Sequence, residues 1–180
     1  MKTIHALAAL AALLAASARA DKPAATSASI FRADVLKNID AVEKKLLGLA
    51  EATPEEKYSF RPEKGVRSTA EVFMHVAGAN YFLATFLGAK APEGLSLNFD
   101  TSASKKAEII EHLKASCAHA RKAVEKVPEA DFTKPIKMFG SDSHLQSAMF
   151  VIANHLHEHL GQAIAYARMS GVKPPWSKGD

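Results

Sequence analysis

The sequence predicts an all-α protein whose single domain is a four-helix bundle. Apolar residues recur at three- and four-residue spacings along four long segments, which is the periodicity of amphipathic helices. Capping sequences, glycines and prolines stand where these segments are expected to begin or end. Four helices of about 20 residues or more are the usual content of a helix bundle. We expect no strand, internal repeat or low-complexity segment.

The first helix is expected to follow a polar leader at residues 21–29 and to end at Thr53-Pro54. A connection at residues 57–67 comes next. The apolar face of this helix consists of Phe31, Val35, Ile39, Val42, Leu46 and Leu49.

The second helix is expected to begin at Ser68-Thr69-Ala70-Glu71, a capping-box sequence, and to run to about Leu87. Residues 88–104 are rich in Gly, Pro, Ser and Asn and form a loop long enough to cross the end of a bundle. The third helix is expected from about Lys105 to Val127, where Pro128 stops it.

The fourth helix is predicted to begin at a second capping box, Ser143-His144-Leu145-Gln146. Gly171 is its expected C-terminal stop, with Pro174-Pro175 beyond it. Its expected buried stripe consists of Leu145, Met149, Ile152, Leu156, Leu160, Ala163 and Ala167.

Residues 1–20 have the pattern of a cleaved signal peptide. A basic start at Lys2 precedes the apolar run Ala6–Ala16 and the small-residue site Ala18-Arg19-Ala20. The apolar run is shorter than the roughly 20 residues that a spanning helix needs. We therefore expect a periplasmic or secreted protein with no stable membrane insertion after cleavage. A retained N-terminal anchor stays open, because Arg19 is unusual so close to a cleavage site.

Cleavage of the 180-residue chain after residue 20 leaves 160 residues, enough for one domain. We expect this domain at residues 30–175, followed by a C-terminal tail at 176–180. Loss of Lys2 and Arg19 lowers the 23 basic residues to 21, against 19 acidic residues. A net charge of about +2 is too small to indicate the strongly basic surface of a nucleic-acid-binding protein, so no nucleic-acid partner is expected.

Cys117 is the single cysteine, which excludes an intramolecular disulfide. It lies within the apolar stripe of the third helix, so we expect a buried thiol; an intermolecular pair stays open. Packing must therefore supply the stability of the mature chain.

Two histidines one helical turn apart, His155 and His159, form a metal-ligand spacing in the fourth helix. Side chains at i and i+4 lie on one face, roughly 5 to 6 Å apart at Cβ. One divalent cation can bridge the pair if a third ligand comes from elsewhere. His157 is turned to the other side of the helix and is excluded from the site.

His75, in the second helix, is the candidate third ligand. Its helix face is expected to be interior; the other residues on this face are Val72, Ala79, Phe82 and Phe86. Three neutral imidazoles with an open fourth position suit a catalytic zinc-type site. The alternative is that His155 and His159 form a polar edge of the bundle and His75 is an ordinary interior histidine.

Other site chemistries do not match the spacing of the remaining residues. The chain has no pair of Glu-x-x-His units, no His-Glu-x-x-His zincin motif, no haem-attachment motif and no Gly-rich phosphate loop. We expect surface positions for His112, His119 and His144, and His5 leaves with the signal peptide.

Several segments, in their order and spacing, resemble the DinB/YfiT-like superfamily of metal-binding four-helix bundles. These segments are Tyr58–Pro62, Glu71–Ala77, His155–Gln162, Tyr166 and Gly171–Pro175. In that family one histidine of the second helix and the i, i+4 pair of the last helix bind a divalent metal. The resemblance thus implies a metal site made of His75, His155 and His159. Family members include metal-dependent thiol S-transferases, a mycothiol-dependent isomerase and many proteins with no assigned reaction.

Two functional hypotheses follow. The first is an exported metal-dependent enzyme, of the hydrolase or thiol-transferase type, acting on a small-molecule substrate that the sequence does not identify. The second is a non-catalytic protein of the periplasm that binds a metal or a small ligand. Zn²⁺ is the expected cofactor, while Ni²⁺, Cu²⁺ and Fe²⁺ also suit three imidazoles.

Catalytic residues stay unknown at this point. Glu71 could contact His75 or a metal-bound water, although the capping role is favoured. Gln162 and Tyr166 could line the site opening. Bundles of this family often pair, so a homodimer also stays open.

Overall fold

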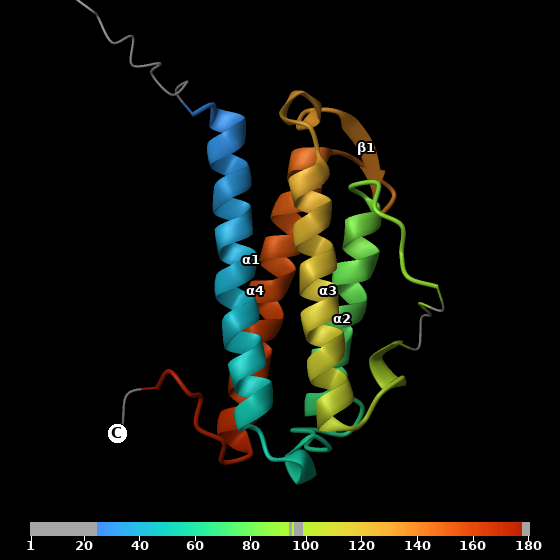
Figure 1. Cartoon of the computed structure of the whole chain (residues 1–180). Helices are drawn as coiled ribbons and strands as arrows, with labels where there is room; N and C mark the ends of the chain where they lie inside the picture. The colour runs from blue at the N-terminus through green and yellow to red at the C-terminus, as the bar shows by residue number, and fades with distance from the viewer. Residues whose placement is uncertain (1–24, 94, 96–98, 178–180) are drawn as a thin grey trace, which may run out of the picture.

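Four helices packed side by side form the fold, in a computed structural model that describes residues 25–93, 95 and 99–177 (Figure 1). The expected signal peptide lies outside the described residues. The helices are α1 (Ser27–Ala52), α2 (Thr69–Thr85), α3 (Lys106–Lys126) and α4 (Leu145–Met169). The predicted all-α four-helix bundle is confirmed.

Each helix contacts two others, so that α1 lies against α3 and α4, and α2 lies against the same two helices. Figure 1 shows that α2 and α3 run in one direction while α1 and α4 run in the other. The chain must therefore return along the bundle between α2 and α3. The loop expected to cross the end of the bundle instead passes beside α2, and its 3₁₀ turn η2 (Phe99–Thr101) packs against that helix.

The two predicted capping boxes have different outcomes. At the start of α2, the Ser68 hydroxyl accepts from the Glu71 N–H at 3.2 Å, and the Glu71 carboxylate accepts from the Ser68 N–H at 2.8 Å. The second box is wrong, because α4 begins after His144, whose side chain makes no capping hydrogen bond. Ser143 lies in a strand instead.

That strand belongs to a short hairpin that the sequence did not predict. Strand β1 (Pro135–Met138) pairs antiparallel with β2 (Ser141–His144). Phe139 and Gly140 join them with φ angles of 52° and 81°, the positive values of a two-residue type I′ turn. Asn-Gly and Asp-Gly are the usual signals for this turn, and Phe-Gly lacks the first of those residues.

The core is built from the inner faces of all four helices, as the helical periodicity predicted. Cys117 is buried, which agrees with the expected thiol environment. Gly171 adopts φ 75° directly after α4 and ends it as expected. The largest fully buried apolar side chains include Ile39, Leu46, Leu49, Phe73, Met74, Ile109, Leu113, Met149, Ile152 and Leu156. In the described part of the chain, none of the helices combines the length and the apolar character that crossing a bilayer requires.

Candidate metal centre

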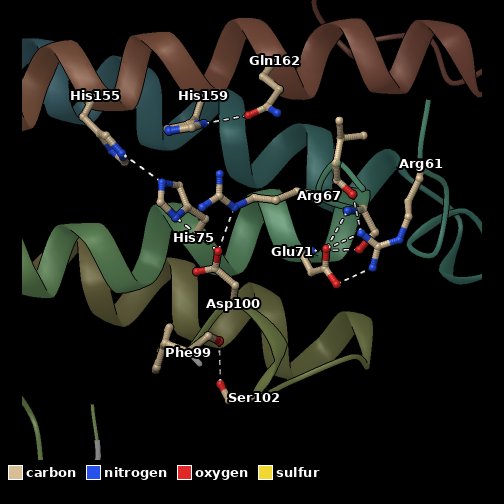
Figure 2. A network of polar contacts seen from close by, with 12 residues as sticks. Arg61, Arg67, Glu71, His75, Phe99, Asp100, Ser102, His155, His159 and Gln162 are labelled. Carbon is tan, nitrogen blue, oxygen red and sulfur yellow. Dashed lines mark hydrogen bonds and ion pairs between the residues drawn. The ribbon is translucent and has the colours of Figure 1, made fainter. Parts of the chain in front are cut away.

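The structure brings His75, His155 and His159 together between α2 and α4 (Figure 2). One ring nitrogen from each of the three lies within 4.8 Å of the other two. The Nε2 atoms of His75 and His155 are 3.3 Å apart. The ring centroid of His159 lies 4.6 Å from that of His75 and 4.4 Å from that of His155. The three predicted residues therefore share one cluster.

The separation of His75 and His155 suits two ligands of one tetrahedral metal ion. Zinc–imidazole bonds are about 2.0 to 2.1 Å long, so two ligand nitrogens on one tetrahedral ion lie roughly 3.3 to 3.4 Å apart. The separation of 3.3 Å between His75 and His155 agrees with this geometry. Of the histidines, cysteines and acidic residues that the structure describes, only these three histidines make up the group.

Asp100 supports His75 from the far side of the imidazole. Its Oδ2 atom lies 3.3 Å from Nδ1 of His75 and accepts a hydrogen bond of 2.7 Å from Nε of Arg67. A carboxylate at this position fixes the imidazole with Nδ1 protonated and Nε2 free, as is common behind metal-binding histidines. Asp100 and Arg67 were missed in the sequence, because both lie in irregular segments where spacing carries no information.

Gly78 allows Asp100 to reach His75. A Cβ atom on Gly78 would lie 2.9 Å from Cδ1 of Phe99, so a larger residue would push the η2 turn away from α2. Phe99 directly precedes Asp100, and its ring packs against Tyr81 at 6.1 Å between centroids. A glycine in the middle of a helical pattern was the one sequence signal for this close approach.

His159 is held by the residues that follow it in α4. Its Nδ1 lies 2.8 Å from Oε1 of Gln162, and Nε2 of Gln162 donates to the Tyr166 hydroxyl at 3.3 Å. Gln162 thus leaves Nε2 of His159 free for a ligand. Of the two residues expected to line the site opening, Gln162 contacts His159, whereas Tyr166 is buried and packs against the ring of Phe60.

Glu71 takes the capping role and no role at the histidines. Its carboxylate accepts from Arg61 and from the Ser68 N–H. The Arg61 hydrogen bond is the main reason why the pKa of Glu71 lies below its usual value. The acid that contacts His75 is Asp100 instead.

The environment of the cluster favours neutral imidazoles. Burial lowers the pKa of His155 to about 4, with further lowering from the nearby His159, His75 and Arg67 charges. Burial and the Arg67 charge also lower the pKa of His75, although Asp100 acts in the opposite direction. Because only a neutral imidazole can bind a metal ion, these shifts keep the ligands available at neutral pH.

The cluster lies at the edge of the bundle and not deep inside it. The His75 side chain is 25% exposed, and Phe82, on the same face of α2, is 48% exposed. The expectation that this face is interior is therefore correct for Val72, which is 1% exposed, and wrong for Phe82. His159, at 8% exposed, is the most buried of the three histidines.

The other histidines stand apart from this cluster. His157 is exposed and bonds to Oδ1 of Asn38 at 3.1 Å, as its exclusion from the site requires. His144 is exposed at the end of the hairpin. His112 and His119 were expected at the surface but are only partly exposed; they pack against the rings of Phe99 and Tyr81.

Comparison with solved structures identifies similar bundles. A DinB-like protein of Bacillus cereus superposes with a TM-score of 0.70 at 16% identity, over 80% of this chain and 95% of that one. YfiT of Bacillus subtilis, described as a probable metal-dependent hydrolase with an unusual four-helix bundle topology, gives 0.61 at 12% identity, over 84% and 93%. Identities this low show a shared fold alone.

Sequence comparison places the chain in a family. A search of curated proteins found no match. The sequence profile of the DinB superfamily matches residues 38–163, which span most of the bundle and include all three histidines of the cluster. The chain belongs to the DinB superfamily.

Proposed function

We propose that this protein is an exported metal-dependent enzyme whose His75, His155 and His159 hold one divalent cation, with Zn²⁺ as the expected ion. The observation that carries the proposal is the convergence of three imidazole nitrogens within 4.8 Å of one another. Hydrolysis or thiol transfer is the expected reaction type, and the description of YfiT as a probable metal-dependent hydrolase favours hydrolysis as the first to be tested.

The bound cation would supply Lewis-acid chemistry, polarising a substrate group or lowering the pKa of a bound water. The protein's own contribution is to position the three ligands. Asp100 holds His75, and Gln162 holds His159, so that each imidazole presents Nε2 to the same point. His155, the third ligand, is kept neutral by burial.

Elemental analysis of the purified mature protein tests the metal site. We expect about one equivalent of metal per chain in the wild type and none in His75→Ala or His159→Ala. His157→Ala is the matched control, because His157 lies on the same helix but outside the cluster, and it should keep its metal. Metal-free wild-type protein after controlled reconstitution would contradict the site.

Circular dichroism of the His75→Ala variant separates a catalytic site from a structural one. A catalytic site should lose its metal with little change in helix content, because the apolar core does not include the histidines. Complete unfolding would instead indicate that the metal mainly stabilises the fold.

Turnover assays separate an enzyme from a non-catalytic binding protein. The metal-loaded protein is tested against ester, amide and thiol-transfer substrates, with His159→Ala as the inactive reference. Turnover that depends on the metal and disappears in His159→Ala supports the enzyme. Full metal loading without turnover in any of these panels favours the binding protein.

Export is tested by the mass and location of the mature chain. Expression of the full-length gene product should give a periplasmic protein that begins at Asp21. A full-length mass in the membrane fraction would instead support a retained N-terminal anchor.

A further inference from the structure

Arg67 has unused hydrogen-bond donors beside the histidine cluster. Its Nε atom donates to Asp100 at 2.7 Å. Within residues 25–93, 95 and 99–177, no acceptor bonds to its Nη1 or Nη2 atom, although a guanidinium carries five N–H donors. The side chain is 40% exposed, so solvent and small molecules can reach part of it.

The position of this guanidinium is set by Asp100 and the histidines. Figure 2 shows the Arg67 side chain extending along the cluster, with its guanidinium between His159, His75 and Asp100. Its positive charge lies close enough to His75 and His155 to contribute to the low pKa of each. A group bound at the open coordination position would therefore lie next to Arg67.

Arg61, an arginine in the same region, has both of its terminal nitrogens hydrogen-bonded to the protein. Its Nη1 donates to the Val66 carbonyl and to Glu71, and its Nη2 donates to Glu71. Both terminal nitrogens of Arg61 are thus engaged in holding the start of α2. Among the described residues, Arg67 has a hydrogen-bond partner at one of its three nitrogens, so its two terminal nitrogens are available to a ligand.

The charge balance around Arg67 favours an anionic ligand. Asp100 is the carboxylate paired with Arg67, and it is shared with Nδ1 of His75. Glu71, the next carboxylate in range, is bound by Arg61. With a divalent cation at the histidines, the positive charges of the ion and Arg67 exceed the single negative charge of Asp100.

We propose that Nη1 and Nη2 of Arg67 bind an oxyanion of the substrate, a carboxylate or a phosphate, while another part of the same molecule faces the metal. The inference rests on the proposed metal site and names the substrate class for it. A guanidinium presents its terminal N–H groups as a planar fork that matches two oxygens of such a group. Arg67 is thereby a substrate-positioning residue that also orders Asp100.

Cobalt-loaded protein provides a test that does not depend on activity. Visible absorption of bound Co²⁺ first reports whether each variant takes up the metal. The same spectrum is then followed while sodium acetate or inorganic phosphate is added, to measure the affinity of each anion. The variants are Arg67→Gln and Arg67→Lys, with Arg61→Gln as the matched control.

We expect wild type and Arg61→Gln to bind at least one of the two anions with equal affinity. Both Arg67 variants should weaken that binding at least about tenfold, the loss expected for a charge-assisted hydrogen-bonded pair. Lysine is included because it keeps the charge beside Asp100 but has a single nitrogen and no fork. The anion that depends more strongly on Arg67 identifies the substrate group as carboxylate or phosphate.

The outcomes separate this inference from the metal site itself. Normal cobalt uptake with anion affinities within twofold of wild type in both Arg67 variants overturns the oxyanion role alone. If Arg67→Gln alone loses cobalt, this variant has released Asp100. The anion affinities of the wild type are then compared with those of Arg67→Lys. Absence of cobalt uptake by the wild type overturns the proposed function and the oxyanion role together.

Discussion

Polar side chains are paired differently at the α1–α3 and α2–α4 interfaces of the bundle. Between α1 and α3, Arg121 donates from Nε to Asp40 at 2.8 Å and from Nη2 to Glu43. Between α2 and α4, three imidazoles face one another, and Nδ1 of His155 is buried with no hydrogen-bond partner among the residues that the structure describes. Arg121, Asp40 and Glu43 thus pair their charges within the protein, whereas the three histidines gather ring nitrogens around a common point.

The two interfaces have different effects on the free energy of unfolding. Paired charges at a partly buried interface stabilise the fold modestly, whereas a buried polar atom without a partner costs free energy, about 1 to 3 kcal/mol. The buried unpartnered nitrogen of His155 therefore lowers the stability of the metal-free protein, and a cation bound at the Nε2 atoms would add stability of its own. The α2–α4 interface has the character of a site, and the α1–α3 interface that of a structural contact.

The largest expected effect comes from His155→Leu. Loss of one of three ligands should weaken metal binding by about a thousandfold or more. In the metal-free state the same variant should raise the unfolding free energy by about 1 kcal/mol, because it removes a buried unpartnered nitrogen. Isothermal titration with Zn²⁺ and urea unfolding measure the two quantities. A metal-free His155→Leu variant clearly less stable than the wild type would show that the cluster is structural.

Arg121→Leu is expected to lower the stability of the protein and to leave its metal affinity unchanged. Removing Arg121 leaves Asp40 and the largely buried Glu43 without their cation, so the unfolding free energy should fall by about 2 kcal/mol. Zinc affinity should stay within twofold of wild type, since the two interfaces lie on different helix pairs. A matching loss of zinc affinity would show that the interfaces are coupled.

Acid should destabilise the metal-free wild type through the α2–α4 interface. The pKa of His155 is lowered by burial from 6.5 to about 4 in the folded protein, so below pH 6.5 the unfolded chain binds the extra proton. Stability is therefore full above about pH 6.5 and falls toward pH 4, by about 3 kcal/mol at most and by less to the extent that solvent screens the partly exposed imidazole. Urea unfolding at several pH values measures the slope, which should be smaller in His155→Leu. Equal slopes in the two proteins would assign the acid sensitivity to other groups.

The sequence predicted the parts of the site that lie on regular helices. The spacing of His155 and His159 places both on one face, and the capping box at Ser68 was sufficient to locate the start of α2. His75 was found because it is the one histidine of the second helix. The expected interior position of its face was correct for Val72 and wrong for Phe82, since periodicity alone does not tell a buried face from one at the edge of the bundle.

The parts that were missed depend on irregular segments. Asp100 reaches His75 only because α2 and α3 are parallel and the connecting chain returns beside α2. The hairpin was missed because Phe139 occupies a position that usually holds Asn or Asp. Ser143 resembled a helix cap, yet the residue pairs with Ile136 in that hairpin. Tertiary context decides such positions, and local pattern does not.

Gly78→Ala tests whether the η2 turn supports the α2–α4 site. The added methyl group would meet the Phe99 ring at 2.9 Å, and a displaced Phe99 moves Asp100 away from His75. Zinc affinity should fall about tenfold, the lower end of the usual effect of losing a carboxylate behind a metal-binding histidine.

Gly161→Ala is the matched control for this substitution, because a Cβ atom at Gly161 meets nothing within 4 Å. It should keep its zinc affinity and gain roughly 0.5 to 1 kcal/mol of stability from the better helix propensity of alanine. Unchanged zinc affinity in Gly78→Ala would mean that Asp100 contributes little to the site.

A crystal structure of the zinc-loaded protein, with anomalous data collected at the zinc edge, tests the central claim most directly. We predict one anomalous peak between α2 and α4, about 2.0 to 2.1 Å from one nitrogen of each of His75, His155 and His159, with no protein atom at the fourth position. A peak held by other residues, or a fourth protein ligand closing the site, would contradict the account of the α2–α4 interface as an open metal centre.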